Sequence, residues 1–493
     1  MPHNEQHDAQ HNDAATPTGQ HATRSAIGND DTTARLPHAR TIELRGHIID
    51  SHILSQVMDL VMDHNAEFYI EQFEVGRNKF DPSYCRLALH AATPEALDDL
   101  LEGVNRLGAQ GLEAEETDAR SAPAPADGVL PEGFHCTTNM PTEVRAGGHW
   151  LPVEAIEMDV AIALRLGPDL LPTGAYIMPM SEVRAGTPIV IGHEGVRVLP
   201  IERPRSPALL GSVARAGPGS GFSFMSSAVS SERPKAAAIA ELAAQMRRVR
   251  DTGGRTLVVG GPAIIHTGAG PQLAALVRAG YINLLFAGNA LAAHDIESAI
   301  YGTSLGVSLD AGTEGAALEH GHEHHLRAIN TIRAAGSIAA AVAQGRLTSG
   351  IMYECVRGNV PFVLAGSIRD DGPLPDVITD AMEAQRAMRQ QVQAPAGIAL
   401  ALLMGTTLHA IAVGNLLPAA TLTVCVDINP AVVTKLLDRG SLQTAGLVID
   451  AGGFLRELAQ QLGVESSRSK VEGRAGGGPL VEGARSKVED ERT

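Results

Sequence analysis

The sequence is poor in cysteine, and none of its cysteines is paired with another in a CxxC motif. Its four cysteines lie far apart, at Cys85, Cys136, Cys355 and Cys425. Scattered single thiols argue against a disulfide framework and indicate a reducing, cytoplasmic compartment. We therefore expect each cysteine to be a small core residue and not a nucleophile.

The sequence also lacks an unbroken apolar run long enough to cross a membrane. The best candidate, residues 394–426, carries no charge but is interrupted by Pro395, His409, Asn415 and Pro418. A transmembrane helix needs about 20 consecutive apolar residues, so buried helix and strand pieces fit better. The N-terminus shows no basic segment followed by an apolar one, so nothing marks it for secretion. No membrane partner is expected.

Positive charge is in deficit as well, because the formal net charge is −17. Such a balance repels nucleic acid but does not prevent small anions from binding at local sites. Residues 1–40 contain almost no large apolar side chain, and residues 464–493 repeat RSKVE around a glycine run. Neither segment can bury enough surface to order itself, so both are predicted to be disordered tails.

What remains predicts an α/β protein of three parts. Residues 41–120 show the order strand, helix, strand, strand, helix, strand, with a second helix capped by Thr93, and predict a ferredoxin-like βαββαβ module. The stretch SAPAPADG is interpreted as a linker. Residues 127–205 contain short alternating runs among many glycines and prolines, which indicates a small β-rich element.

Residues 211–463 alternate apolar strands with alanine-rich helices. Continuous apolar strands, such as RTLVVGG, YINLLFAGN, TLHAIAVGN and TVCVDIN, are typical of a parallel sheet covered by helices on both faces, a Rossmann-like arrangement. In such sheets ligands bind at the carboxyl ends of the strands. We therefore expect a ligand site where these strands end.

The predicted strand ends carry small and short polar residues. Glycine lets a backbone approach a pyrophosphate closely, and a carboxylate suits the paired hydroxyls of a ribose. A helix cap is an equally good interpretation of Asp427 and of Asp450. The GGPAIIHTGAG segment does not have the GxGxxG spacing, so it is a weak dinucleotide signal alone. The candidate cofactor-binding residues are Gly260, Gly261, Pro262, Ala263, Asn289, Ala290, Ser367, Ile368, Gly414, Asn415, Asp427, Asn429, Asp450 and Ala451.

Several segments resemble a known family. GHIIDSHIL, VGRNKFDPSY, CTTNMPTEV, FSFMSSAVSSERP, VVGGPAIIHTGAG, FAGNALAAHDIE, LAGSIRDDGPLPD and VDINPAVVTKLLDRGS occur in the order found in proteins that join an LOR/SDH conserved domain to a deoxyhypusine-synthase-like NAD-binding domain. That family includes archaeal-type ornithine cyclodeaminases and the C-terminal part of cyanobacterial arginine dihydrolase/ornithine cyclodeaminase fusions. The resemblance covers residues 41–463 and implies conversion of L-ornithine to L-proline and ammonia, with NAD as a bound cofactor.

That chemistry would require groups that move protons and a cation for the substrate carboxylate. The acids beside the matching motifs, Asp295, Glu297, Asp370 and Asp371, are the candidate catalytic residues. First-turn helix charges and a turn are the structural alternatives. Arg77, Lys79, Asn139 and Arg369 are the candidate substrate-binding residues. For Arg77 and Lys79 this requires reaching across from the first module, and a solvated hairpin is the simpler interpretation.

The run EHGHEHH places His320 near His324 and His322 near His325 if it is helical. No cysteine or further histidine cluster completes a metal site, so no metal is expected; solvent-facing and proton-relay roles remain open. We expect a small amino-acid substrate and a homo-oligomer. An NAD-dependent amino-acid or saccharopine-type dehydrogenase is the runner-up function. A non-catalytic sensor of NAD and amino acids is the third.

Overall fold

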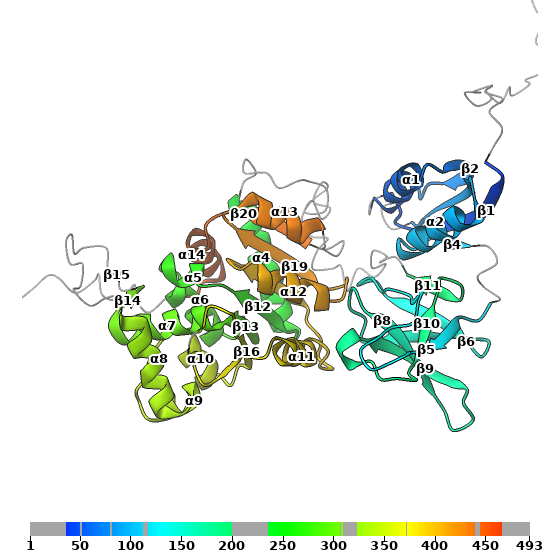
Figure 1. Ribbon diagram of the computed structural model, residues 1–493. Coiled ribbons are helices and arrows are strands. Elements are labelled where there is room, and N and C mark those ends of the chain that lie inside the picture. Colours follow the sequence, from blue (N-terminus) through cyan, green and yellow to red (C-terminus); the bar gives the residue numbers. More distant parts are fainter. Residues whose placement is uncertain are drawn as a thin grey trace, which may run out of the picture.

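The computed structural model describes residues 36–49, 52–78, 81–111, 117–199, 235–305, 307–308, 323–370, 372–438 and 444–465. These residues form three modules in chain order, as Figure 1 shows. Within these ranges no helix is long and apolar enough to span a bilayer. The prediction of an α/β protein with a ferredoxin-like module, a β-rich middle element and a parallel C-terminal sheet is confirmed.

The first module is the expected βαββαβ unit. Its elements are β1 (His38–Gly46), α1 (Ile53–Asp63), β2 (Glu67–Glu74), β3 (Ser83–Ala91), α2 (Pro94–Arg106) and β4 (Gln110–Gly111). The sheet order is β2-β3-β1-β4, with β1 antiparallel to both neighbours. Thr93 caps α2 as predicted, accepting a hydrogen bond from the Ala96 amide at 3.2 Å. Alternate residues of β1 and β3, among them Leu44 and Leu87, pack against the two helices.

The middle module is a seven-stranded sheet with the shape of a half-barrel. It comprises β5 (Arg120–Pro123), β6 (Thr142–Ala146), β7 (His149–Glu154), β8 (Ala161–Leu166), β9 (Pro172–Met178), the 3₁₀ turn Met180–Glu182, β10 (Pro188–Ile191) and β11 (Val196–Val198), in the order β11-β6-β7-β9-β8-β10-β5. The interpretation of SAPAPADG as a linker is wrong in its first part. Ser121, Ala122 and Pro123 pair with β10 as an edge strand, the position in a sheet where proline is tolerated.

The third module has the Rossmann architecture. It comprises α4 (Lys235–Asp251), β12 (Thr256–Gly260), α5 (Ala263–His266), α6 (Gly270–Arg278), β13 (Leu284–Gly288), α7 (Asn289–Tyr301), β14 (Thr303–Ser304), β15 (Val307–Ser308), α8 (His324–Ala335), α9 (Ile338–Ala343), α10 (Ile351–Arg357), β16 (Phe362–Ala365), β17 (Val377–Ile378), α11 (Ala381–Val392), β18 (Leu400–Met404), α12 (Leu408–Leu416), β19 (Leu422–Asp427), α13 (Pro430–Asp438), β20 (Thr444–Val448) and α14 (Ala451–Leu462).

Its seven parallel strands follow the order β17-β16-β13-β12-β18-β19-β20. Side chains such as Val258 and Leu285 point to the face covered by α4 to α10 and α14. Side chains such as Leu257 and Phe286 point to the opposite face, covered by α11, α12 and α13. Burial on both faces explains why these strands are continuously apolar in sequence. Cys355 and Cys425 lie in these two cores, and burial raises the pKa of each thiol to about 12.

The half-barrel docks against the last turns of α11 and α12 (Figure 1). The Arg389 guanidinium, on α11, forms a buried ion pair with Glu157, with an Nε to Oε2 distance of 2.8 Å. The Met158 amide donates to the Asn415 carbonyl oxygen at 2.9 Å, at the end of α12. These contacts fix the half-barrel to the helices on one face of the parallel sheet.

Candidate functional site

The parallel sheet reverses its direction of growth between β12 and β18. From β12 the chain adds β13, β16 and β17 on one side, and then returns to add β18, β19 and β20 on the other. The Gly261 amide, just beyond β12, donates to the Met404 carbonyl oxygen at 2.9 Å. A Cβ atom at Gly261 would lie 1.9 Å from the Gly405 carbonyl oxygen, so glycine is required there. Open parallel sheets bind ligands at such a switch point.

The structure places most of the predicted cofactor residues along this carboxyl edge. The set comprises Gly260, Gly261, Pro262 and Ala263 after β12, Asn289 and Ala290 after β13, Ser367 and Ile368 after β16, Asp427 and Asn429 at β19, and Asp450 and Ala451 after β20. Three large apolar side chains at these tips are exposed: Ile368 at 107%, Leu408 at 81% and Ile428 at 72%. Apolar side chains gathered on one rim indicate a surface that a ligand covers.

Two other predicted cofactor-binding residues, Gly414 and Asn415, do not lie at the carboxyl edge. TLHAIAVGN is not a strand: Leu408–Leu416 forms α12. Gly414 and Asn415 therefore lie at the far end of a helix, where Asn415 Nδ2 donates to Asp159 Oδ2 of the half-barrel at 3.3 Å. The neighbouring strand is β18, and its tip is Gly405, Thr406 and Thr407, with Gly405 at φ +61°. Short apolar runs do not distinguish strand from helix by periodicity, which explains the error.

The two strand-end aspartates both accept backbone hydrogen bonds. Asp450 caps α14, since its Oδ2 accepts from the Gly453 amide at 2.6 Å. Asp427 Oδ1 accepts from the Asn429 amide at 2.8 Å, and the Asn429 side chain accepts from Ala431. The capping interpretation is therefore observed at Asp450, whereas Asp427 accepts a hydrogen bond within the turn that precedes α13. Asp427 is half-buried, and its Oδ2 forms no hydrogen bond or ion pair with the described residues, which leaves that oxygen available to a ligand.

Asp370 lies among groups from three strand ends. Its Oδ2 accepts from the Ser367 amide at 2.8 Å and its Oδ1 from Asn289 Nδ2 at 3.2 Å. His409, which the sequence did not single out, lies close by: its Cε1 would be 2.9 Å from a Cβ atom at Gly288. Burial lowers the pKa of His409, against the opposing charge of Asp370. The imidazole is therefore neutral at neutral pH and can accept a proton.

Asp295 lies inside α7, beyond its first turn, and its carboxylate faces another helix. Its oxygens accept from the Ile351 and Met352 amides at 2.9 and 2.8 Å, which caps α10. Burial raises the pKa of Asp295 to about 6, although both amides oppose the shift. This environment gives Asp295 a capping role that first-turn reasoning does not predict.

Glu297 belongs to a buried polar cluster at the end of α7. Its carboxylate accepts from Thr303 Oγ1 and is 2.9 Å from His294 Nδ1. His294 lies against His266, with 4.8 Å between ring centroids, and burial lowers the pKa of His266. Other contacts of this cluster include the Leu305 amide with Glu297 Oε2, His266 with Ser304, and His324 with Thr303.

The described part of the histidine run lies beside this cluster. His324 stacks on Tyr301, with 4.7 Å between ring centroids, and His325 lies 6.1 Å from His294 by the same measure. His320 and His322 lie outside the described residues, as do Asp371 and Lys79. No group of His, Cys, Asp and Glu among the residues that can be described is arranged to hold a metal ion.

The predicted substrate-binding residues are dispersed. Arg369 is exposed beside Asp370 at the rim. Arg77 is exposed in the turn between β2 and β3 of the first module, which Figure 1 shows above the half-barrel and apart from the parallel sheet. Asn139 is 5% exposed, and its carbonyl oxygen accepts from the Ala419 amide at the half-barrel interface. Of the three predicted substrate-binding residues that the structure describes, Arg369 alone is therefore at the strand tips.

Comparison with known families accounts for the three modules. Residues 39–140 match the LOR/SDH bifunctional enzyme conserved region. Residues 141–239 match the family described as arginine dihydrolase ArgZ-like, C-terminal, first region, and residues 240–458 match its Rossmann-fold region. The resemblance stated from the sequence motifs is confirmed.

Individual relatives extend over almost the same range. The chain is 49% identical, over 86% of its length, to 98% of an ornithine cyclodeaminase from Methanothermobacter thermautotrophicus. A solved LOR/SDH protein from Methanococcus maripaludis is 45% identical, with a TM-score of 0.62 over 73% of this chain and 99% of that one. The apo structure of ArgZ, a cyanobacterial arginine dihydrolase, is 35% identical, with a TM-score of 0.72 over 89% of this chain and 60% of that one.

Proposed function

Because the chain belongs to the family of the archaeal ornithine cyclodeaminases, we propose that it converts L-ornithine to L-proline and ammonia with bound NAD⁺. The observation that carries the proposal is the 49% identity with one such enzyme over 98% of that protein. An identity spread over all three modules includes the carboxyl edge of the parallel sheet. The proposal therefore concerns an enzyme whose chemistry takes place at that edge.

The rim has the properties that a dinucleotide requires. Gly261 and Gly405 let two strand ends meet at the switch point, and α12 begins beside them with its first amides directed to the rim. Asp427 would hold a ribose through its free oxygen. Ile368, Leu408 and Ile428 would cover the apolar faces of the bases. A dinucleotide held by these residues would supply reversible hydride transfer at the α-carbon of ornithine.

Side chains of the protein would transfer protons and pair with the charged groups of the substrate. His409 is held neutral by burial, so it can take a proton from a substrate ammonium and leave an amine able to attack. Asp370, which Ser367 and Asn289 hold in place, faces the same region and would stabilise the resulting imidazolium. Arg369 carries the cation for the substrate carboxylate. The apolar rim residues would exclude water from the reacting groups.

Product analysis tests the proposal. Purified protein is incubated with L-ornithine and a catalytic amount of NAD⁺, and proline, ammonia and reduced nicotinamide are measured. Equal amounts of proline and ammonia without accumulated NADH are expected, because the hydride returns to the product. Stoichiometric NADH would instead identify an amino-acid dehydrogenase. Thermal stabilisation by both ligands without turnover would identify a sensor.

A further inference from the structure

One exposed histidine at the rim, His266, lies outside the groups assigned to the reaction. It ends α5, the short helix that directly follows the tip of β12. At the start of that helix, the Ala263 Cβ atom is 3.0 Å from the position of a Cβ atom at Gly405, the tip of β18. At its end, Thr267 Oγ1 is 2.9 Å from the position of a Cβ atom at Gly452, after β20. His266 therefore lies between two strand ends of the proposed nucleotide site.

His266 and His409 approach the switch point from opposite faces of the parallel sheet. Ile264 of α5 packs into the core under α4 to α10 and α14. α12, which carries His409, packs on the other face through Ala410. His409 reaches the tip of β13, where its Cε1 would be 2.9 Å from a Cβ atom at Gly288. Since β12 and β13 are paired neighbours, a small molecule over these two tips has one imidazole on each side.

The imidazole of His266 has the properties of a base. Its Nδ1 is 2.7 Å from Ser304 Oγ, a contact that fixes the orientation of the ring, and its Nε2 forms no hydrogen bond with the described residues. Partial burial lowers the pKa of His266, and the neighbouring His294 lowers it further, against the charge of Glu297. The ring is therefore neutral at neutral pH, while the residue as a whole remains exposed. A neutral imidazole at the surface of a ligand site can accept a proton.

A buried carboxylate fixes the histidine that lies beside His266. The Glu297 side chain is 0% exposed and accepts from His294 Nδ1 at 2.9 Å. It also accepts from Thr303 Oγ1 at 2.9 Å and from the Leu305 amide at 3.2 Å. Because an ionised carboxylate only accepts hydrogen bonds, His294 carries a proton on Nδ1. The His294 ring centroid is 4.8 Å from that of His266. A polar series thus leads from a sealed carboxylate to an exposed imidazole at the rim and holds that imidazole in position.

The proposed reaction requires two bases. L-Ornithine enters with two ammonium groups, and both nitrogens must lose a proton, the α-nitrogen before it becomes an imine and the δ-nitrogen before it attacks. Both protons return at the end, one to the nitrogen of proline and one to the departing ammonia, so the reaction has no net uptake or release of protons. A neutral imidazole holds one added proton at a time. His409 therefore accounts for one of the two transfers.

We propose that His266 is a second catalytic residue, which accepts the proton of the other substrate ammonium, with His294 and Glu297 as positioning residues. This inference rests on the proposed conversion of ornithine. An N–H bond of the ammonium breaks, its electron pair stays on the substrate nitrogen, and the proton moves to Nε2 of His266. The negative charge of Glu297, behind His294, stabilises the imidazolium until the proton returns to product.

Steady-state kinetics of proline formation test the assignment first. His266→Gln should lower kcat by about 100- to 10,000-fold, the range of general base catalysis, while KM for L-ornithine changes little. Free imidazole added to His266→Ala should restore part of the rate, because it can occupy the space left by the side chain. Glu297→Gln keeps the shape of the positioning residue but removes its charge. It should give a smaller loss of kcat at unchanged KM, a split that general structural damage does not produce.

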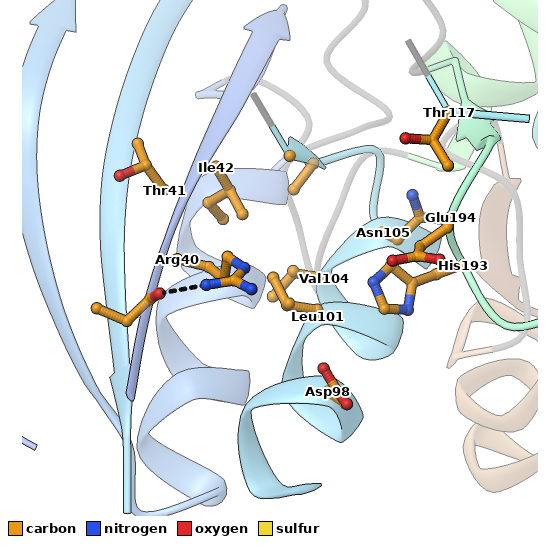
Figure 2. Close-up of a pocket in the computed structure, with 13 residues that line it drawn as sticks. Arg40, Thr41, Ile42, Asp98, Leu101, Val104, Asn105, Thr117, His193 and Glu194 are labelled. Atoms are coloured by element: carbon orange, nitrogen blue, oxygen red, sulfur yellow. Dashed lines mark hydrogen bonds between the residues drawn. The ribbon is translucent and has the colours of Figure 1, made fainter. Parts of the chain in front are cut away.

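Chemical labelling of the unchanged protein supplies a second test that needs no variant to fold. Diethyl pyrocarbonate acylates neutral imidazoles, and peptide mass spectrometry gives the rate at each histidine. NAD⁺ with excess L-ornithine should protect His266 more than NAD⁺ alone. His193 is the control, because it lines a cleft between the first module and the half-barrel, away from the rim (Figure 2). It should react at one rate under all conditions, and His193→Gln should keep the unchanged kcat.

Two results would overturn the inference. One is a kcat in His266→Gln equal to that of His193→Gln. The other is labelling of His266 at the same rate with NAD⁺ alone as with NAD⁺ and L-ornithine. Failure of the proposed function is a different result, the absence of proline from the unchanged protein.

Discussion

Asp427→Ala is the substitution that tests the nucleotide site most directly. The half-buried Asp427 carboxylate lies at the end of β19 on the rim, and its Oδ1 accepts a hydrogen bond from the Asn429 amide at 2.8 Å. A hydrogen bond to a charged group contributes about 1.5–3 kcal/mol, so loss of the hydrogen bond between Asp427 and one ribose should raise the Kd for NAD⁺ by about 10- to 100-fold. The lost turn bond should cost about 1 kcal/mol of unfolding free energy. Calorimetric titration with NAD⁺ and urea unfolding measure the two effects separately.

Asp450→Ala is the matched control, because it removes a carboxylate from the next strand end that caps a helix through the Gly453 amide at 2.6 Å. Loss of this cap should lower the unfolding free energy by about 1 kcal/mol, similar to the local damage in Asp427→Ala. A smaller effect on NAD⁺ affinity is expected. If Asp427→Ala binds NAD⁺ as tightly as the unchanged protein, the assignment of the ribose to this aspartate is refuted.

Three further predictions concern buried charges. The pKa of Asp295 is about 6 in the folded protein and 3.8 when unperturbed. Its contribution of about 3 kcal/mol to the free energy of unfolding is therefore present below about pH 4 and is lost as the pH rises through 6. Urea unfolding at several pH values should show this loss of stability, and Asp295→Asn should make the stability less dependent on pH. Arg389→Leu leaves Glu157 buried without its partner and should cost about 3–5 kcal/mol, which the double change Arg389→Leu with Glu157→Leu should largely recover in thermal unfolding. His409→Gln should abolish proline formation. In the unchanged enzyme, kcat/KM should fall on the acid side with a pKa below the ordinary histidine value of 6.5, because burial favours the neutral imidazole. An acid-side pKa above 6.5 would contradict the role of His409.

The fold was predictable where local patterns and burial agree. β1 and β3 alternate because one face of their sheet packs on helices, and β12 is continuously apolar because both of its faces are covered. Prediction failed where pairing is non-local. Ser121–Pro123 is held in a strand by β10, more than sixty residues later in the chain, and no short-range signal in SAPAPADG reports that partner.

The site was predictable to the level of strand ends, but not to the level of individual roles. Asp295 follows the Asn289 tip in sequence, yet the cap it forms depends on α10, which the order of motifs does not place beside it. His409 was overlooked because the apolar run around it was interpreted as a strand, which put the tip at Gly414. Once Leu408–Leu416 is a helix, His409 belongs to its first turn and therefore to the rim.

α12 connects the two regions of the molecule that the chemistry requires. Its first turn carries His409 against Gly288 at the switch point, and its last turn holds Met158 and Asp159 of the half-barrel through Asn415. A helix of nine residues is about 13 Å long and nearly rigid. A shift of the half-barrel at one end must therefore be accompanied by a shift of the histidine at the other, or by loss of the Asn415 contacts.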